Sequence, residues 1–411
     1  MKRLNKLVIT KWKTKVLTAL VADGKTIQLQ MDDQEERSIL NNIYIGKVKN
    51  IVTNINSAFV ELGDGQIGYY SLTENPDHVY TKPHSGKKLK EGDEILVQVS
   101  RDAVKTKAPV LTSFFSFTGK YSVLTPGKNR IGFSTKIQDQ EWKSSMKEEI
   151  LNILPSDAGV IVRTNAKEAS PEELLGEIAR LNQQYRTVLD HTAYRTCFSL
   201  LYQAPPQFVT SIRDSYAENL EEIVTDCQDI YETLSQYMTL NQPEDLHKLR
   251  LYADPLLPME KLYNLEGALS QATNKNVWLK SGGYLVIEQT EAMVVIDVNT
   301  GKYVGKKNVK DTMLKINLEA AQEIGKQLRL RNLSGIIIVD FIDMERTEDK
   351  TTLLETLSEI VSRDPVKTTV VDMTRLNLVE LTRKKVLRPL HEQMKVAPKN
   401  TAEMLENEFK K

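Results

Sequence analysis

Three polar residues stand where apolar segments of the chain end, and their side chains are of the kind that binds a hard metal ion. Asp297 directly follows the apolar run 293–296, Asn299 comes two residues later, and Asp340 directly follows the apolar run 336–339. Two carboxylates and an amide oxygen suit Mg²⁺, which keeps waters and substrate phosphates in its shell. Such an ion can activate a water for phosphodiester hydrolysis. The alternative is that each Asp only caps a neighbouring loop; the paired arrangement with Asn299 favours the metal site.

The elements predicted around these residues would bring them together. Residues 284–287 and 293–298 read as strands, 311–329 as a helix with its apolar residues on one face, and 336–340 as a strongly apolar strand. A strand–helix–strand order predicts a right-handed crossover between parallel strands. The carboxyl ends of both strands then lie at one edge of the sheet, where sites of α/β proteins usually form. We therefore expect the three polar groups to converge there.

Basic residues are frequent around this segment, and a phosphate-binding pattern occurs far upstream. The lysines and arginines near the segment suit a nucleic-acid backbone, although for any single lysine a solvated helix face is the better reading. They are Lys302, Lys306, Lys307, Lys310, Lys326, Arg329 and Arg331. Upstream, Arg163 and Thr164 follow the apolar strand 159–162. A guanidinium fork beside a hydroxyl suits a terminal phosphate; the alternative is an Arg paired with a surface carboxylate.

Composition bounds the class of protein without naming a ligand. The chain has 411 residues, which suggests about two to four domains. Its 55 basic and 55 acidic side chains cancel, so any affinity for nucleic acid has to come from local patches. Cys197 and Cys227 form neither a disulfide framework nor a zinc spacing. No apolar run is long enough to span a bilayer and the start does not read as a signal peptide, so we expect a cytoplasmic protein.

The order of predicted elements indicates several parts. Three strands are expected within residues 1–35, and five short strands within about 75 residues from 36 to 113, the size and strand count of an OB-type barrel. Mixed α/β structure follows from residue 114, with a capping box that begins a helix at 170–173. Residues 206–265 read as wholly helical, because acidic and apolar residues are interleaved there.

Several motifs together resemble the catalytic core of the ribonuclease E/G family. They are IDVNTG at 296–301, NLEAA at 317–321, QLRLRNLSG at 327–335, DFIDM at 340–344 and LVELTRKK at 378–385. NIYIGK at 42–47 and AFVELG at 58–63 extend the likeness to nearly the whole chain, weakly in 206–275. The resemblance implies a short-form, metal-dependent endoribonuclease that hydrolyses single-stranded RNA in rRNA processing and mRNA decay and is stimulated by a 5′-monophosphate end.

The resemblance also implies an α/β multidomain fold, in which an RNase H-like part is interrupted by an OB-type β-barrel and followed by a DNase I-like catalytic part. The expected segments are 1–35, RNase H-like; 36–113, the RNA-binding barrel; 114–205, RNase H-like with the 5′ sensor; 206–275, a helical connection; 276–400, DNase I-like; and 401–411, a tail.

Roles of single residues follow from the same resemblance. Asp297 and Asp340 would hold Mg²⁺, or Mn²⁺ in its place, and Asn299 would assist catalysis. Asp343 is a weaker candidate, for which a structural cap is the better reading. Phe59 and Tyr69 would stack on RNA bases, although periodicity alone favours Phe59 as a core residue.

Phosphate contacts are implied at two further places. Lys105 and Lys107 match lysines that contact the RNA backbone, and the resemblance does not separate the two. The 5′-phosphate sensor would comprise Gly119, Val123, Arg163, Thr164 and Lys367. Lys367 stands where the family carries arginine, so it keeps the charge and loses the fork.

One departure from the family is plain, and it bears on assembly. The zinc-linking cysteine motif expected after 383–385 is absent, so no structural zinc is expected and a homodimer would be independent of zinc. A non-catalytic RNA-binding protein and a metal-dependent DNase remain the alternatives. The intact Asp297 and Asp340 argue against the first, and the barrel with Arg163 and Thr164 argues against the second.

Overall fold

The computed structural model describes seven stretches of the chain, namely residues 5–33, 38–82, 88–103, 107–127, 130–215, 220–301 and 309–395. These stretches divide between two compact units. The first unit comprises Met1–Glu36, Leu220–Glu232 and Lys248–Lys411, and the second comprises Arg37–Asn219 and Thr233–His247. Each unit has its own sheets and its own apolar core. The first unit is therefore formed by three segments of the chain and the second unit by two.

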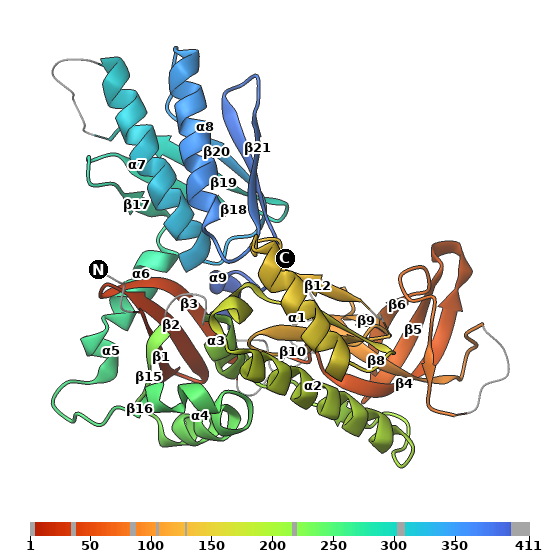
Figure 1. Ribbon diagram of the computed structural model, residues 1–411. Helices are drawn as coiled ribbons and strands as arrows, with labels where there is room; N and C mark the ends of the chain where they lie inside the picture. Colours follow the sequence, from red (N-terminus) through yellow and green to blue (C-terminus); the bar gives the residue numbers. More distant parts are fainter. Residues whose placement is uncertain are drawn as a thin grey trace, which may run out of the picture. The chain divides into compact units, whose positions relative to one another are not determined.

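A five-stranded sheet in the first unit is built from two distant parts of the chain. Its order is β16-β15-β1-β2-β3, formed by β1 (Asn5–Trp12), β2 (Lys15–Ala22), β3 (Lys25–Asp33), β15 (Leu220–Thr225) and β16 (Leu249–Leu251). The first three strands are antiparallel neighbours, whereas β15 runs parallel to β1 and β16 parallel to β15 (Figure 1). Helices α5 (Met259–Leu262) and α6 (Leu265–Thr273) contribute to its core.

The expectation that residues 206–265 are wholly helical is wrong. Helices α3 (Gln207–Ser215) and α4 (Gln228–Asn241) are present there, but β15 and β16 complete the sheet begun by β1–β3. In β15 the acidic pair Glu221 and Glu222 interrupts the apolar residues and imitates an amphipathic helix. Pairing with β1 overrides this local pattern, because a short strand takes its stability from its neighbours rather than from its own propensity.

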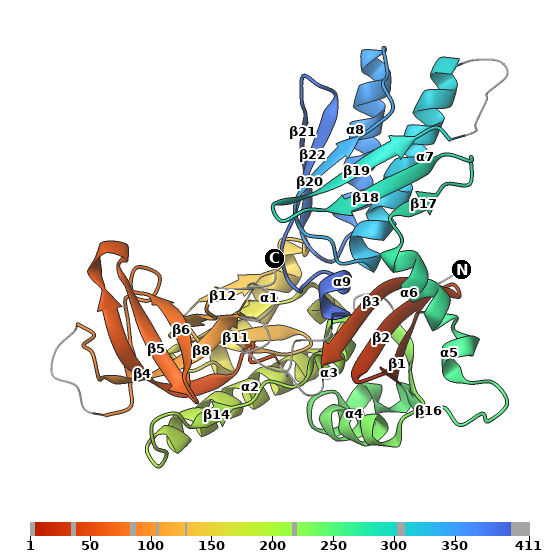
Figure 2. The same ribbon diagram turned by 180° about the vertical axis from the view of Figure 1, so that it is seen from behind.

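A six-stranded sheet forms the rest of the first unit's scaffold. Its order is β17-β18-β19-β20-β22-β21, with β17 (Asn276–Trp278), β18 (Tyr284–Gln289), β19 (Met293–Asn299), β20 (Gly335–Asp340), β21 (Thr368–Met373) and β22 (Leu378–Arg383). Helices α7 (Val309–Leu330) and α8 (Thr347–Ser362) lie on one face of this sheet (Figures 1 and 2). Strands β19 and β20 are parallel, which confirms the predicted crossover through α7. A short helix, α9 (Leu390–Gln393), follows β22.

A closed barrel of five strands lies in the second unit, as the strand count predicted. Its strands are β4 (Ile43–Val52), β5 (Ser57–Gly63), β6 (Gln66–Ser71), β9 (Val110–Thr112) and β8 (Glu94–Arg101), and it closes because β4 also pairs with β8. Short strands β7 (Val79–Tyr80) and β14 (Leu200–Tyr202) extend β8 and β4. The barrel encloses its own core of apolar side chains.

A four-stranded sheet in the same unit carries the region around Arg163. Its order is β10-β11-β13-β12, from β10 (Phe117–Thr118), β11 (Ser122–Pro126), β12 (Ile131–Phe133) and β13 (Ala158–Val162). Helices α1 (Gln140–Ile153) and α2 (Pro171–Thr192) belong to its core. The predicted capping box is confirmed, because Ser170 and Glu173 bond reciprocally at the start of α2. Within the described stretches no helix is long and apolar enough to cross a membrane.

Candidate active site

The two candidate metal-binding carboxylates occupy facing positions at the ends of adjacent strands. Asp297 of β19 and Asp340 of β20 are register partners in the parallel pair, and both residues are exposed. Asn299, two residues beyond Asp297 on the same strand face, donates its Nδ2 to Asp297 Oδ2 over 2.7 Å. The predicted convergence of these three residues at the carboxyl edge of the sheet is confirmed.

Alternation along β19 explains why the carboxylates face outward. Val294, Ile296 and Val298 are buried in the core that the sheet shares with α7 and α8. Because successive side chains of a strand point to opposite faces, Asp297 and Asn299 point to the face away from the helices. The apolar half of the strand thus anchors it, and the polar half presents the candidate ligands on an open face.

Among the described residues, the charges that act on Asp340 are negative, which favours a cation. Partial burial raises the pKa of Asp340, and the negative charges of Asp297 and Asp343 raise it further. A divalent ion would remove this repulsion. Among the described residues no cluster of three or more His, Cys, Asp or Glu side chains fits a metal ion. Two carboxylates with an amide form a small set of hard oxygen atoms, the kind of set that Mg²⁺ or Mn²⁺ binds when waters complete its shell.

Two further residues shape the loop that follows Asp340. Asn377 donates its Nδ2 to Asp343 Oδ1 over 3.1 Å, so Asp343 has the structural partner that its reading as a cap requires. Asn317 is fully buried on α7, and its amide both donates to the Ile342 carbonyl over 2.8 Å and accepts from the Ile342 N–H over 3.1 Å. Sequence reasoning assigned Asn317 no role. An amide on the apolar face of a helix was the signal that could have revealed one.

The basic residues expected to face nucleic acid divide into three groups. Lys302, Lys306 and Lys307 lie outside the described residues, as does the side chain of Lys310. Lys326 is exposed and pairs with Glu323.

Two arginines at the end of α7 have structural partners instead. Arg329 bonds Gln28 Oε1, and the buried Arg331 donates to the carbonyls of Asn274 and Gln271. Burial lowers the pKa of Arg331 to about 10. The expectation that Arg331 contacts nucleic acid is therefore wrong, because its guanidinium joins α7 to the chain segment before β17.

The barrel presents an aromatic pair on its outer surface. Phe59 of β5 and Tyr69 of β6 are register partners, and their ring centroids lie 6.1 Å apart in an edge-to-face arrangement. Phe59 alternates with the buried Ala58 and Val60, so it is not part of the barrel core, contrary to what periodicity alone favoured. Ser57 donates its hydroxyl to Tyr69 Oη over 2.7 Å and fixes that ring. Two aromatic faces are thus available on one side of the barrel.

Of the two candidate lysines of the barrel, Lys107 lies within the described residues. Lys107 is exposed, three residues before β9 begins. Lys105 lies outside the described residues.

Four of the five candidate sensor residues lie close together in the second unit. Arg163 donates its Nη1 to the Gly119 carbonyl over 2.8 Å, and Thr164 shares a hydrogen bond of 2.8 Å with Ser134. Val123 lies on β11, directly beside Ile161 of β13. The fifth residue, Lys367, is exposed, precedes β21 and belongs to the first unit.

Arg163 already has an anionic partner. Its Nη2 donates to Asp214 Oδ1 over 3.0 Å. Arg213 binds both oxygens of the same carboxylate, over 3.1 and 3.0 Å. Burial alone would raise the pKa of Asp214, but Arg213 and Arg163 lower it overall. The alternative reading of Arg163, an arginine paired with a carboxylate, is thus what the structure contains, while its contact with a phosphate stays a prediction.

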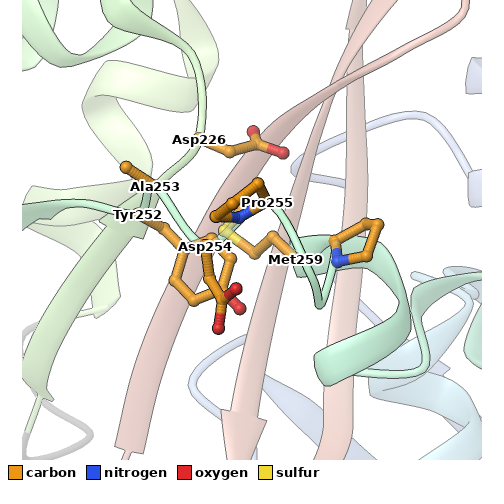
Figure 3. A pocket seen from close by; sticks show the side chains of 7 residues that line it. Asp226, Tyr252, Ala253, Asp254, Pro255 and Met259 are labelled. Carbon is orange, nitrogen blue, oxygen red and sulfur yellow. The ribbon is translucent and has the colours of Figure 1, made fainter.

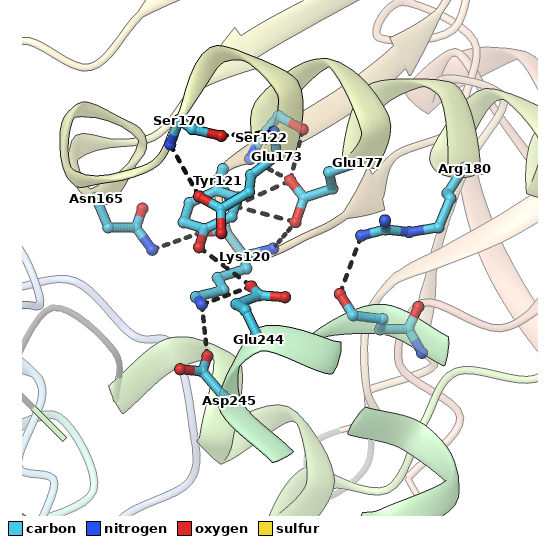
Figure 4. Close-up of polar contacts among 11 residues, drawn as sticks. Lys120, Tyr121, Ser122, Asn165, Ser170, Glu173, Glu177, Arg180, Glu244 and Asp245 are labelled. Atoms are coloured by element: carbon cyan, nitrogen blue, oxygen red, sulfur yellow. Dashed lines mark hydrogen bonds and ion pairs between the residues drawn. The ribbon is translucent and has the colours of Figure 1, made fainter. Parts of the chain in front are cut away.

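A buried carboxylate holds the turn that carries Gly119, and sequence reasoning missed it. Glu177 of α2 accepts from the N–H groups of Lys120, Tyr121 and Ser122 over 2.6, 2.9 and 2.8 Å (Figure 4). A Cβ on Gly119 would collide with the Glu177 carboxylate, so a larger residue there would displace Glu177 from these bonds. A glutamate on the apolar face of the predicted helix was the available signal.

Lys120 in the same turn is almost fully buried and is balanced by acidic side chains. Its Nζ donates to Glu244 over 2.8 Å and to Asp245 over 2.5 Å (Figure 4). Burial lowers the pKa of Lys120, but the bonds to Asp245 and Glu244 outweigh this and raise it overall. A buried charge that loses its partner destabilises a protein strongly, so this lysine has a structural role.

A hollow of about 320 Å³ in the first unit contains none of the candidate residues. Asp226, Tyr252, Ala253, Asp254, Pro255, Pro258 and Met259 line it (Figure 3). Asp226 accepts a hydrogen bond from Thr10 over 2.7 Å and so joins β15 to β1. We assign no function to this hollow, because none of the candidate metal-binding, stacking or sensor residues lines it.

Known proteins similar to this chain agree on one family. A model of the "Ribonuclease E/G family" matches residues 116–386. Ribonuclease G of Haemophilus influenzae is 34% identical over 382 residues, which cover 90% of this chain and 78% of that protein. Ribonuclease G of Escherichia coli K12 is 32% identical over 88% of this chain and 76% of its own length. Ribonuclease E of a Synechocystis species is 31% identical over 86% of this chain and 53% of its own length.

Proposed function

The chain belongs to the ribonuclease E/G family, and we propose that it is a metal-dependent endoribonuclease that hydrolyses single-stranded RNA. The observation that carries this proposal is the register pair Asp297–Asp340 at an open sheet edge, with Asn299 bonded to one of the two carboxylates. Ribosomal precursors and messenger RNAs are the proposed substrates, and the cytoplasm is the proposed location.

The residues at the sheet edge divide the work of catalysis. Asp297 and Asp340 would hold Mg²⁺ or Mn²⁺, and an ion bound there would supply an activated water and stabilise charge on the phosphate. Asn299 orients the Asp297 carboxylate through their hydrogen bond. Asn317 fixes the loop after Asp340 through its two bonds to Ile342. These contacts limit the motion of both carboxylates before substrate arrives, which favours catalysis by positioning.

RNA recognition is assigned to the second unit. Phe59 and Tyr69 offer stacking faces that tolerate any base, as proteins that bind single strands commonly do. Arg163 and Thr164, with Gly119 and Val123, receive a 5′-monophosphate, since a guanidinium and a hydroxyl suit its oxygens. The family resemblance also assigns Lys367, in the first unit, to recognition of the 5′ end. Lys105 or Lys107 adds a contact to the RNA backbone.

At the level of the fold, we assign the closed barrel to the OB type, the sheet of β1–β3, β15 and β16 to an RNase H-like part, and the six-stranded sheet with α7 and α8 to a DNase I-like part. We propose a homodimer, and we infer that it is independent of zinc because Cys197 and Cys227 lack a zinc-site spacing. Sedimentation that is unchanged by a zinc chelator supports this assembly, and dissociation by the chelator contradicts it.

A single cleavage assay tests the proposed activity. The substrate is a 5′-monophosphorylated, single-stranded, A/U-rich RNA, incubated with and without Mg²⁺, beside a DNA of the same sequence. We expect internal cleavage of the RNA only with metal. Binding without cleavage under all metal conditions would support the alternative, a non-catalytic RNA-binding protein. Cleavage of the DNA at an equal rate would support a metal-dependent DNase.

A further inference from the structure

A second aromatic pair, of exposed Trp278 and half-buried Tyr284, lies beside the candidate catalytic carboxylates. Trp278 of β17 is the register partner of Tyr284 of β18, and their ring centroids lie 5.1 Å apart. Tyr284 is in turn the register partner of Asn299 on β19. Trp278, Tyr284 and Asn299 therefore form one row across three neighbouring strands, and the row ends next to Asp297.

All members of this row point to the open face of the sheet. Their sequence neighbours Leu279, Leu285 and Val298 are buried in the core with α7 and α8. Because directly opposed residues of antiparallel strands share a face, the two aromatic rings lie on the face of Asn299 and Asp297. Neighbouring strands are about 4.8 Å apart, so the backbone of Trp278 lies about 10 Å from that of Asn299. This distance suits a nucleotide near the scissile phosphate.

Packing within the fold does not explain the exposure of Trp278. The residue is 69% exposed, whereas a tryptophan that stabilises a core is largely covered. Its position is nonetheless defined, because Glu319 of α7 accepts from the N–H groups of Lys280 and Ser281 over 2.7 and 3.2 Å and so fixes the turn that joins β17 to β18. The large apolar ring is thus held in place and left open to solvent.

We propose that Trp278, supported by Tyr284, is a stacking subsite for a nucleobase of the RNA strand close to the cleaved phosphodiester. The subsite rests on the proposed function, because its ligand is the strand held at Asp297 and Asp340. Continuity of the row with the carboxylates selects a base of the substrate as the occupant. Exposed Lys280, two residues beyond Trp278, adds a positive charge that suits the backbone of the same strand.

The first experiment combines Trp278→Ala with single abasic substitutions in a short RNA that has one cleavage site. In the wild type, one abasic position near the site should lower kcat/KM by about 5- to 150-fold, the value of one stack of 1–3 kcal/mol. In Trp278→Ala, kcat/KM for the intact RNA should already be lowered by the same factor. An abasic substitution at that position should then cause no further decrease. Trp278→Phe should restore part of the effect.

A matched control separates stacking from general damage to the sheet. Met293→Ala removes an apolar side chain from the same face, at the opposite end of β19. It should leave the abasic profile as in the wild type. An identical abasic profile in the wild type and Trp278→Ala would overturn the proposal. A change in the sedimentation of Trp278→Ala together with an unchanged abasic profile would also overturn it, because the ring would then form a contact between copies of the chain.

A second measurement does not depend on cleavage. The chain has three tryptophans, and Trp12→Phe with Trp142→Phe leaves Trp278 as the only one. Titration of this variant with single-stranded RNA in the presence of EDTA should quench its fluorescence as RNA binds. Quenching without cleavage in metal would preserve the subsite and reject the proposed catalysis. RNA binding without quenching would reject the subsite and leave the catalytic proposal intact.

Discussion

The sheet edge at Asp297 and Asp340 and the site around Arg163 are both suited to charged ligands, but they are balanced in opposite ways. At the sheet edge two carboxylates face each other, and partial burial and the charges of Asp297 and Asp343 raise the pKa of Asp340. Around Arg163, Asp214 already bonds two guanidinium groups. Among the described residues the first site brings like negative charges together, whereas in the second the protein already supplies a carboxylate to two guanidinium groups.

This difference predicts how much a ligand or a substitution changes at each site. A cation that binds the sheet edge gains attraction and also removes repulsion, so loss of either carboxylate should have a large effect. A phosphate that binds Arg163 competes with Asp214 for the guanidinium. The binding free energy therefore reflects only the difference between the interaction of Arg163 with the phosphate and its interaction with Asp214. The sensor site should therefore give graded effects.

The largest expected effect belongs to Asp297→Asn and Asp340→Asn. Each substitution removes an anionic metal ligand while nearly preserving the shape of the side chain. Loss of a residue that only supports a metal ligand commonly lowers metal affinity or activity about 10- to 100-fold, so loss of a ligand itself should lower kcat by at least about 100-fold. RNA binding in EDTA should persist. Glu355→Gln, at an exposed position of α8, removes one negative charge in the same way. This control variant should retain wild-type rates. Near-normal cleavage by either Asp variant would remove the metal site from the mechanism.

An intermediate effect is expected at the barrel, where no ionic ligand is involved. Tyr69→Ala should weaken binding of single-stranded RNA by about 1–3 kcal/mol, the loss of one stack. Tyr69→Phe keeps the ring and loses only the bond from Ser57, so it should bind nearly as the wild type does. Equilibrium binding in EDTA measures both. Equal affinities for the wild type and a folded Tyr69→Ala would exclude Tyr69 as a stacking residue.

A graded effect is expected at the sensor, measured as the ratio of kcat/KM for one RNA with a 5′-monophosphate and with a 5′-hydroxyl end. Arg163→Lys keeps the charge and loses the fork, so this ratio should fall by about tenfold, the value of one bond between charged groups, while basal cleavage persists.

Asp214→Asn sharpens the contrast between the two sites. It removes the competing negative charge near Arg163, so the ratio should rise if Asp214 competes with the phosphate. If the ratio falls instead, Asp214 orients Arg163 rather than opposing its ligand. A wild-type ratio near one would mean that RNA ends are not sensed.

The smallest effect concerns the stability of the metal-free protein. A carboxyl group whose pKa is raised on folding contributes stability below its unfolded pKa and loses it as pH rises through the folded pKa. At neutral pH ionised Asp340 is therefore unfavourable, and Asp340→Asn should raise the free energy of unfolding, by no more than about 1 kcal/mol for so exposed a group. Denaturant titration in EDTA measures this. A decrease would mean that the two carboxylates do not repel.

Local patterns in the sequence were sufficient for much of the fold and for the position of the candidate active site at the sheet edge. Strand β5 of the barrel alternates in burial, and the strand–helix–strand order alone placed Asp297 beside Asp340. Such features are set by the chain's own periodicity and by the handedness of crossovers, so they can be read before any distant partner is known.

What the sequence left undecided depended on partners far away along the chain. Strands β15 and β16 are strands because β1 pairs with them, and Arg331 is buried because the carbonyls of Asn274 and Gln271 accept its bonds. Glu177 and Asp214 acquired their roles through the Gly119 turn and Arg163, which lie about fifty residues away in the sequence. Tertiary structure alone decided these cases, because the type of a polar residue states what it can bind, whereas its partner is fixed only when the chain brings two distant segments together.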